Sequence, residues 1–192
     1  MKKSRKLVEH AKNLSSSDLY NFILHSNKYI PNNYQIKIYH ARELSNEYQK
    51  QIIELFEMNM KILYEQSNDG YNFDEKQNEL FSNQSRYLLI LSSNNLLLAF
   101  AHFRFDIDYG SRVLYLYELQ VNKNYQGQGL GQWIVEQMKL FCQKTQMLKI
   151  ILTVYKINKK AIDFYMKKCQ FEIDITDPSD EHVDYIILSF TL

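Results

Sequence analysis

The sequence predicts one α/β (α+β) domain, with helices flanking a mixed, mostly antiparallel central sheet and a helical arm at the N-terminus. Extended apolar runs separated by short polar turns occupy residues 87–121, and a glycine-rich segment at 126–131 joins the last run to an amphipathic helix. Strand and helix patterns then alternate to the C-terminus, as in mixed folds. A chain of 192 residues, 45% of them hydrophobic, suffices for one compact core.

The arm is predicted over residues 1–33, ahead of a main domain at 34–192. Residues 3–25 have a weak helical pattern, and Ser15 to Asp18 interrupts it with residues that cap helices. The basic first residues fit a frayed, solvated terminus better than a nuclear-targeting or nucleic-acid patch. Pro31-Asn32-Asn33 then breaks the chain before the first predicted strand.

The first half of the main domain predicts one strand, two helices and three antiparallel strands. Tyr48, Ile52, Leu55, Phe56 and Leu63 form one helical stripe, and the polar Asn68-Asp69-Gly70 breaks it. Short turns at 92–95 and 109–111 separate the later strands. The predicted elements are a strand at 34–39, helices at about 43–63 and 73–81, and strands at 87–91, 96–105 and 113–121.

In the last third, Leu130, Trp133, Ile134, Met138 and Phe141 share a helix face directly after the glycine-rich segment. Further on, the patterns predict a strand at 149–155, a helix at 158–168 and closing strands at 171–175 and 185–190.

Composition limits the range of partners. The 23 Lys and Arg nearly cancel the 22 Asp and Glu, so no general attraction to nucleic acid or membrane is expected. No apolar run is long enough to cross a membrane, and the polar start does not resemble a signal peptide. Cys142 and Cys169 lack the spacing of zinc or redox motifs and are expected to be buried free thiols. We expect a soluble protein of a reducing, intracellular compartment.

The glycine-rich segment Gln126-Gly127-Gln128-Gly129-Leu130-Gly131 carries the first chemical signal. Its backbone N–H groups and the start of the next helix can bind a phosphate, because no side chains intervene. A plain turn before a helix is the alternative. A dinucleotide fingerprint is disfavoured, because it needs a parallel strand-helix-strand unit near the front of a larger domain.

The second signal is Asn158 followed by Ala161-Ile162-Asp163-Phe164-Tyr165. Together the two segments resemble the Q/R-x-x-G-x-G/A loop and the N-x-x-A-x-x-[FL]-Y helix of the GNAT acetyltransferases. The resemblance implies a GNAT fold and acetyl-CoA as co-substrate, with no metal. It implies that the cofactor-binding residues are Leu119, Gln120, Val121, Gln126, Gly127, Gln128, Gly129, Leu130, Gly131, Gln132, Asn158 and Tyr165.

A closer resemblance covers roughly residues 58–190. It is carried by the stretches at 63–67, 102–106, 115–120, 152–155 and 171–174, which are similar to the histone-specific N-alpha-acetyltransferase D family. That family has Trp-Gly-Trp where this chain has Asp69-Gly70-Tyr71, so an aromatic wall of the peptide site is either missing or supplied by Tyr71.

The closer resemblance implies acetyl transfer to the N-terminal serine of tails beginning Ser-Gly-Arg-Gly, as in histones four and two-A. It implies a monomer of the cytoplasm and nucleus and leaves open whether the protein works at ribosomes. The implied catalytic residues are Glu118 and Tyr117, and the implied peptide site is Tyr64, Asp106, Asp108, Tyr115, Tyr117, Thr153 and Tyr185.

The residues themselves are compatible with this chemistry. An α-amino group has a pKa of about 7.7 to 8.0 and loses its proton far more easily than a lysine at about 10.4, so a modest base suffices. Glu118 stands in an apolar and aromatic strand, where a carboxylate is either functional or part of a structural ion pair, and we favour function. Strict alternation would place Tyr117 and Glu118 on opposite faces, so both serve one site only if the strand bulges, as the GNAT resemblance implies.

Other features remain open to two interpretations. Asp106 and Asp108 share a strand face, where they either bind a substrate arginine or form a solvated strand end. His102 fits a core histidine better than a catalyst, and the five histidines lack metal spacing. The alternative functions are acetyl transfer to lysine side chains or polyamines, and a GNAT module that binds without turnover.

Overall fold

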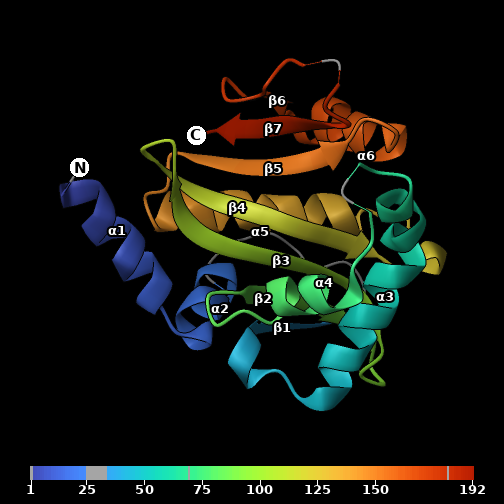
Figure 1. The fold of residues 1–192 in the computed structure, drawn as a ribbon. Coiled ribbons are helices and arrows are strands. Elements are labelled where there is room, and N and C mark those ends of the chain that lie inside the picture. Colours follow the sequence, from blue (N-terminus) through green and yellow to red (C-terminus); the bar gives the residue numbers. More distant parts are fainter. Residues whose placement is uncertain (1, 25–33, 69, 181) are drawn as a thin grey trace.

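The computed structural model describes residues 2–24, 34–68, 70–180 and 182–192 (Figure 1). Within these ranges the chain forms a seven-stranded sheet in the order β1-β2-β3-β4-β5-β7-β6. Every neighbouring pair is antiparallel except β4 and β5, so the predicted mixed, mostly antiparallel sheet is confirmed. The strands are β1 (Gln35–His40), β2 (Arg86–Leu91), β3 (Leu97–Asp108), β4 (Ser111–Val121), β5 (Lys149–Tyr155), β6 (Glu172–Ile173) and β7 (Tyr185–Thr191).

Helices cover both faces of the sheet (Figure 1). Helices α1, α2 and α5 pack on one face over the larger core, and α3 packs on the other face over a smaller core that contains Ile52 and Phe56. Side chains cap α3 and α4: the Ser45 hydroxyl accepts from Tyr48 N–H, and Asn72 accepts from Asp74 and Glu75. The helices are α1 (Lys2–Asn13), α2 (Ser16–Leu24), η1 (Ala41–Glu43), α3 (Asn46–Glu65), α4 (Phe73–Leu80), η2 (Lys123–Tyr125), α5 (Leu130–Lys144), α6 (Lys159–Asp163) and the π-helical η3 (Phe164–Lys168).

The two helices predicted for the arm are present, and they pack on the sheet. Val8 and Ala11 of α1 and Leu19 and Ile23 of α2 are buried in the larger core. The predicted break at Pro31 to Asn33, and with it the boundary at residue 33, lies outside the described residues.

Two irregularities of β4 create the space for a site. Hydrogen-bonded pairing of β4 with β5 ends at Tyr115 and Ile151, although both strands continue, so they diverge beyond that point (Figure 1). In the pairing of β4 with β3, His102 lies opposite Glu118 and Phe103 opposite Leu116, which leaves Tyr117 as an extra residue. This bulge confirms the expectation, and it turns Tyr117 and Glu118 towards the same face.

Cys142 and Cys169 are buried and free, as predicted. Burial raises the pKa of Cys142 to about 12 and that of Cys169 to about 11, so both thiols stay protonated at neutral pH. None of the described helices has the length and apolar composition that a membrane crossing requires.

Candidate functional site

A cavity of about 350 Å³ lies where β4 and β5 diverge. Residues of β4 and β5 form two of its walls, α3 and α4 contribute Tyr64 and Lys76, and Tyr165 comes from η3. The structure therefore brings together most of the predicted catalytic and peptide-site residues. The predicted site residues that line the cavity are Tyr64, Tyr115, Tyr117, Glu118, Leu119, Gln120, Thr153, Asn158, Tyr165 and Tyr185.

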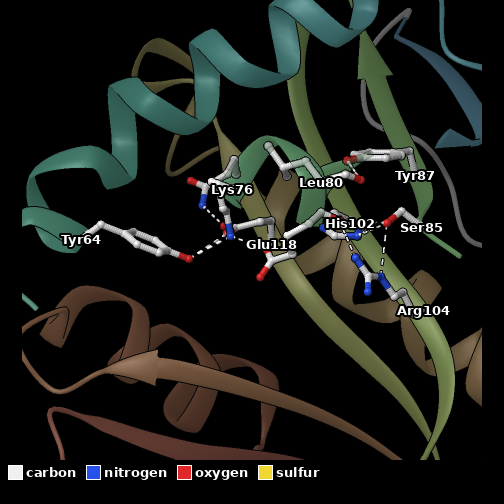
Figure 2. A network of polar contacts seen from close by, with 10 residues as sticks. Tyr64, Lys76, Leu80, Ser85, Tyr87, His102, Arg104 and Glu118 are labelled. Carbon is white, nitrogen blue, oxygen red and sulfur yellow. Dashed lines mark hydrogen bonds and ion pairs between the residues drawn. The ribbon is translucent and has the colours of Figure 1, made fainter. Parts of the chain in front are cut away.

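Glu118 lies on the floor of this cavity, with 5% of its surface exposed. Its Oε1 is 2.6 Å from Lys76 Nζ (Figure 2). Its Oε2 accepts a hydrogen bond of 2.8 Å from Gln120 Nε2. The Tyr64 hydroxyl donates to Oε1 over a longer distance, 3.5 Å. The sequence left open whether Glu118 is a catalytic base or part of a structural ion pair. The structure shows that Glu118 forms an ion pair with Lys76, and this pairing is compatible with a role as base.

Lys76 of α4 is a site residue that the sequence analysis missed. Its Nζ donates 2.8 Å to the Tyr64 hydroxyl and lies 2.5 Å from Glu79 Oε1, and it faces the Phe56 ring at 4.8 Å. Burial alone would lower the pKa of Lys76, but the charge of Glu118, aided by Tyr64 and Glu79, outweighs it and raises the pKa. The sequence feature that could have identified Lys76 is its position one helical turn before the buried Leu80, on the face that the helix buries.

Tyrosine side chains surround Glu118. The hydroxyls of Tyr115 and Thr153 are 2.8 Å apart and link β4 to β5 across the opening. Burial raises the pKa of Tyr64, Tyr115, Tyr117 and Tyr165, so all four hydroxyls are protonated at neutral pH. The site can therefore offer proton donors as well as the carboxylates of Glu118 and Glu79.

Asp106 and Asp108 do not line the cavity. Because β3 residues alternate between faces, both share a face with Arg104, which stacks on the Tyr117 ring at 4.4 Å. Asp106 Oδ1 is 3.4 Å from Lys12 Nζ of α1. Burial raises the pKa of the Asp108 carboxyl. Their role as an arginine site stays a prediction.

Tyr71 stands where the resemblance left an aromatic wall in question. Its ring lies 6.2 Å from Tyr64 and 6.3 Å from Phe56, and its hydroxyl donates to Glu57 at 2.8 Å. It therefore supports Tyr64 from behind and is not part of the cavity wall. Asp69 lies outside the described residues.

The glycine-rich segment forms the turn between β4 and α5, as predicted. Gly127 and Gly129 have φ of 77° and 87°, a left-handed backbone that favours glycine, and Gly129 caps α5. A Cβ at Gly131 would lie 3.2 Å from the Phe164 ring. The first N–H groups of a helix have no acceptor within it, so this bare backbone at the start of α5 fits a pyrophosphate.

The remaining predicted cofactor residues adjoin this turn. Gln126 Nε2 donates 3.0 Å to the Val121 carbonyl and so fastens the turn to the end of β4, and the Leu119 side chain lies 3.6 Å from the Cβ position of Gly131. Gln128 and Gln132 are exposed on the turn and on the first turn of α5. These residues place the glycine-rich turn next to the cavity, and their role in binding a phosphate stays a prediction.

Lys160 is a second residue that the sequence analysis missed. Its Nζ donates to Gln126 Oε1 at 2.5 Å, which places the ammonium beside the glycine-rich turn. We expect Lys160→Met to weaken coenzyme A binding about fivefold, because an exposed charge beside a phosphate contributes roughly 1 kcal/mol. Isothermal titration calorimetry at low and high salt measures it, and the loss should shrink at high salt. Lys159→Met, which removes the neighbouring charge, is the control. Equal losses of coenzyme A affinity in the two variants would contradict the assignment of Lys160 to the phosphate site.

His102 is a core residue, as expected. Its ring is stacked between Tyr87 and Tyr117 at 5.2 and 5.0 Å, and Nε2 is 2.9 Å from the Ser85 hydroxyl. Burial lowers its pKa well below the ordinary value, so the ring is neutral. In the part of the chain that the structure describes, no three His, Cys, Asp or Glu side chains form a group that could hold a metal ion.

Solved structures share this fold. An acetyltransferase from Streptococcus agalactiae is 19% identical, with a TM-score of 0.65 over 84% of this chain and 99% of that chain. Arabidopsis thaliana Naa50 in complex with the bisubstrate analogue CoA-Ac-MVNAL is 21% identical, with a TM-score of 0.56 over 82% and 99%. The NatC complex bound to Gag peptide and CoA is 15% identical, with a TM-score of 0.61 over 83% and 98%.

The family model described as the acetyltransferase (GNAT) family matches residues 50–171. The match begins within α3 and extends past η3, so it contains the glycine-rich turn, Tyr165 and most of the cavity wall, and of the described residues that line the cavity only Tyr185 lies beyond it. The chain therefore belongs to the acetyltransferase (GNAT) family and is an acetyl-CoA-dependent acyltransferase with the GNAT fold.

Proposed function

We propose that the protein acetylates the N-terminal α-amine of polypeptides that begin Ser-Gly-Arg-Gly, the start of histones four and two-A. The observation that carries this proposal is the position of the Glu118 carboxylate inside a cavity walled by tyrosine hydroxyls, between two diverging strands. Such a cavity admits a narrow chain end and provides a proton acceptor next to it. Two of the similar structures are an Naa50 with a peptide-containing bisubstrate analogue and a NatC with a peptide, which supports a peptide acceptor.

Different residues of the cavity and of the adjoining turn have different roles in acetyl transfer. Acetyl-CoA supplies the acetyl thioester, and the turn at Gln126 to Gly131 would hold its pyrophosphate. Backbone N–H groups near Leu119, on the edge that β5 leaves, polarise the acyl oxygen. Glu118 accepts the proton of the attacking amine, directly or through one water. As the N–C bond forms and the C–S bond breaks, the hydroxyl of Tyr165 or Tyr117 protonates the sulfur.

Selection of the peptide rests on the mouth of the cavity. Tyr64, Tyr115, Thr153 and Tyr185 offer hydroxyls and ring faces to the first residues. We propose that Asp106 and Asp108 pair with the substrate arginine further out, in competition with Lys12. A function on histone tails places the protein in the cytoplasm and nucleus.

The test is acetyl transfer to three peptides, read by mass spectrometry. One begins Ser-Gly-Arg-Gly with a free amine, the second has alanine in place of the arginine, and the third is blocked at its N-terminus but carries lysines. Modification of the first peptide at its N-terminus, with strong loss in the second, supports the proposal. Modification of the third peptide alone would replace it with lysine acetylation.

A further inference from the structure

We propose that Lys76 is the positioning residue of the acyl-transfer site: it holds the Glu118 carboxylate in one orientation and supplies the positive charge that this buried carboxylate needs. This inference rests on the proposed role of Glu118 as the base. Lys76 does not touch the reacting atoms in this scheme, and it acts through its contact with Glu118.

The contact is close and buried. Lys76 Nζ lies 2.6 Å from Glu118 Oε1, with side-chain exposures of only 7% and 4% (Figure 2). The stem of Lys76 crosses the aromatic surface of α3, where its Nζ faces the Phe56 and Tyr64 rings at 4.8 and 5.0 Å. These rings restrict the ammonium to the side of the cavity where Glu118 lies.

The second carboxylate oxygen is fixed independently. Gln120 Nε2 donates to Glu118 Oε2 at 2.8 Å, and Asn59 of α3 in turn donates to Gln120 Oε1 at 3.1 Å. Lys76 and Gln120 together fix both oxygens and therefore the plane of the carboxylate. A carboxylate has about four acceptor positions, so these two contacts leave room for the proton of an amine or a bridging water.

The charges around Glu118 explain why an ammonium is needed. Glu79 of α4 also lines the cavity and is negative, and it pairs with Lys76 as well. Arg104 of β3 donates to the Glu79 carbonyl and to Ser85. The groups from the other elements are neutral at pH 7: Tyr64 of α3, Tyr87 of β2, His102 of β3, Tyr117 of β4 and Tyr165 of η3. Among the residues that the structure describes, Lys76 is thus the cation in direct contact with Glu118.

A carboxylate as buried as that of Glu118 is costly unless a cation lies beside it. Removing a carboxyl from water raises its pKa, and an adjacent positive charge opposes that rise. A protonated carboxyl cannot accept the proton of the amine. Stability alone gives little reason for such a pair, since well-packed apolar residues often serve a buried position as well or better. The location of the pair in the cavity wall therefore favours a catalytic reason.

The first test compares pH profiles of kcat/KM for Lys76→Met and Lys76→Arg with the same acceptor. With methionine we expect the acid limb to move to higher pH by about one unit or more and the rate at pH 7 to fall at least about tenfold. Arginine keeps the charge and should leave the limb near its original pH. Lys139→Met, which removes a half-buried lysine paired with Glu136 away from the cavity, is the control that should leave it unmoved.

The second test does not depend on the acceptor. The side-chain carboxyl of Glu118, assigned by its loss in Glu118→Gln, is followed by ¹³C NMR against pH in the free protein. A midpoint that rises in Lys76→Met supports the inference even if the peptide proposal fails. If Lys76→Met does not fold, Lys76→Gln keeps a donor without the charge and carries the same test. An unchanged NMR midpoint and acid limb in a folded uncharged variant would overturn the inference.

Discussion

Replacing Glu118 with glutamine will lower kcat/KM for the acceptor peptide by about 100-fold or more, because an amide cannot accept the proton of the attacking amine. Glutamine has nearly the same shape and can still meet Lys76 and Gln120, so the loss should appear in kcat. Coenzyme A binding should stay within about twofold, because the glycine-rich turn is untouched. Steady-state kinetics and calorimetry measure the two quantities, and 100-fold corresponds to about 2.7 kcal/mol of activation free energy.

Glu57→Gln is the matched control for this variant. Glu57 is a carboxylate of α3 that accepts from the Tyr71 hydroxyl, and it lies outside the cavity wall. Its loss should change kcat/KM by less than about threefold, as expected for a surface substitution. If the Glu118→Gln enzyme is as fast as the wild type, water or another group accepts the proton of the amine. If the wild type and Glu118→Gln bind coenzyme A equally well and neither turns over, the protein is a non-catalytic module.

The order of elements could be predicted from the sequence because most of them carry strong local signals. The stripe of α3, the turns around β3 and the glycines before α5 all act over a few residues. The bulge at Tyr117 was predictable only through the family resemblance, which places Tyr117 and Glu118 in one site, as a regular strand cannot. These features determine where the chain turns and which face each strand presents.

Lys76 could not be identified as a site residue in the same way. A short amphipathic helix at 73–81 was predicted, but its pattern does not say which strand it will cover. The role of Lys76 depends on its partner Glu118. Glu118 is on β4, which comes to lie next to α4 only through long-range strand pairing. Lys160 is similar, because its contact with Gln126 joins two motifs that are separate in the chain.

The aromatic wall shows the limit of comparing motifs by position. Tyr71 occupies the place of a family tryptophan, yet its ring packs behind Tyr64 and its hydroxyl is bound by Glu57. A smaller ring at that place reaches Tyr64 without entering the cavity. On the side of α3 the cavity is therefore lined by Tyr64 and Met60, and the Tyr64 ring meets Tyr155 of β5 edge-on at 5.2 Å.

Replacing Arg86 with methionine will lower the free energy of unfolding by about 3 kcal/mol, because the arm is fastened to the sheet through this side chain. Arg86 is 2% exposed on β2, and its Nη2 donates to the carbonyls of Lys12 and Leu14 at 2.7 Å and of Ala11 at 3.3 Å. The last carbonyls of a helix have no partner within it, so Arg86 satisfies the end of α1. Methionine fills similar space but removes the donor of the Lys12 carbonyl, whereas Ala11 keeps a bond from Leu14 N–H and the Leu14 carbonyl keeps its contact with His40 Nε2.

Urea unfolding and amide hydrogen exchange separate the two parts of this effect. The midpoint should fall with the global free energy, and exchange in α1 should become faster than in α5 if the arm opens before the sheet. Lys12→Gln, which breaks only the partly exposed contact with Asp106, should cost less than about 1 kcal/mol. If Arg86→Met is as stable as Lys12→Gln, Arg86 does not hold the arm, and the apolar contacts of Val8 and Leu19 together with the hydrogen bond from Ser16 to Glu43 are sufficient to hold it.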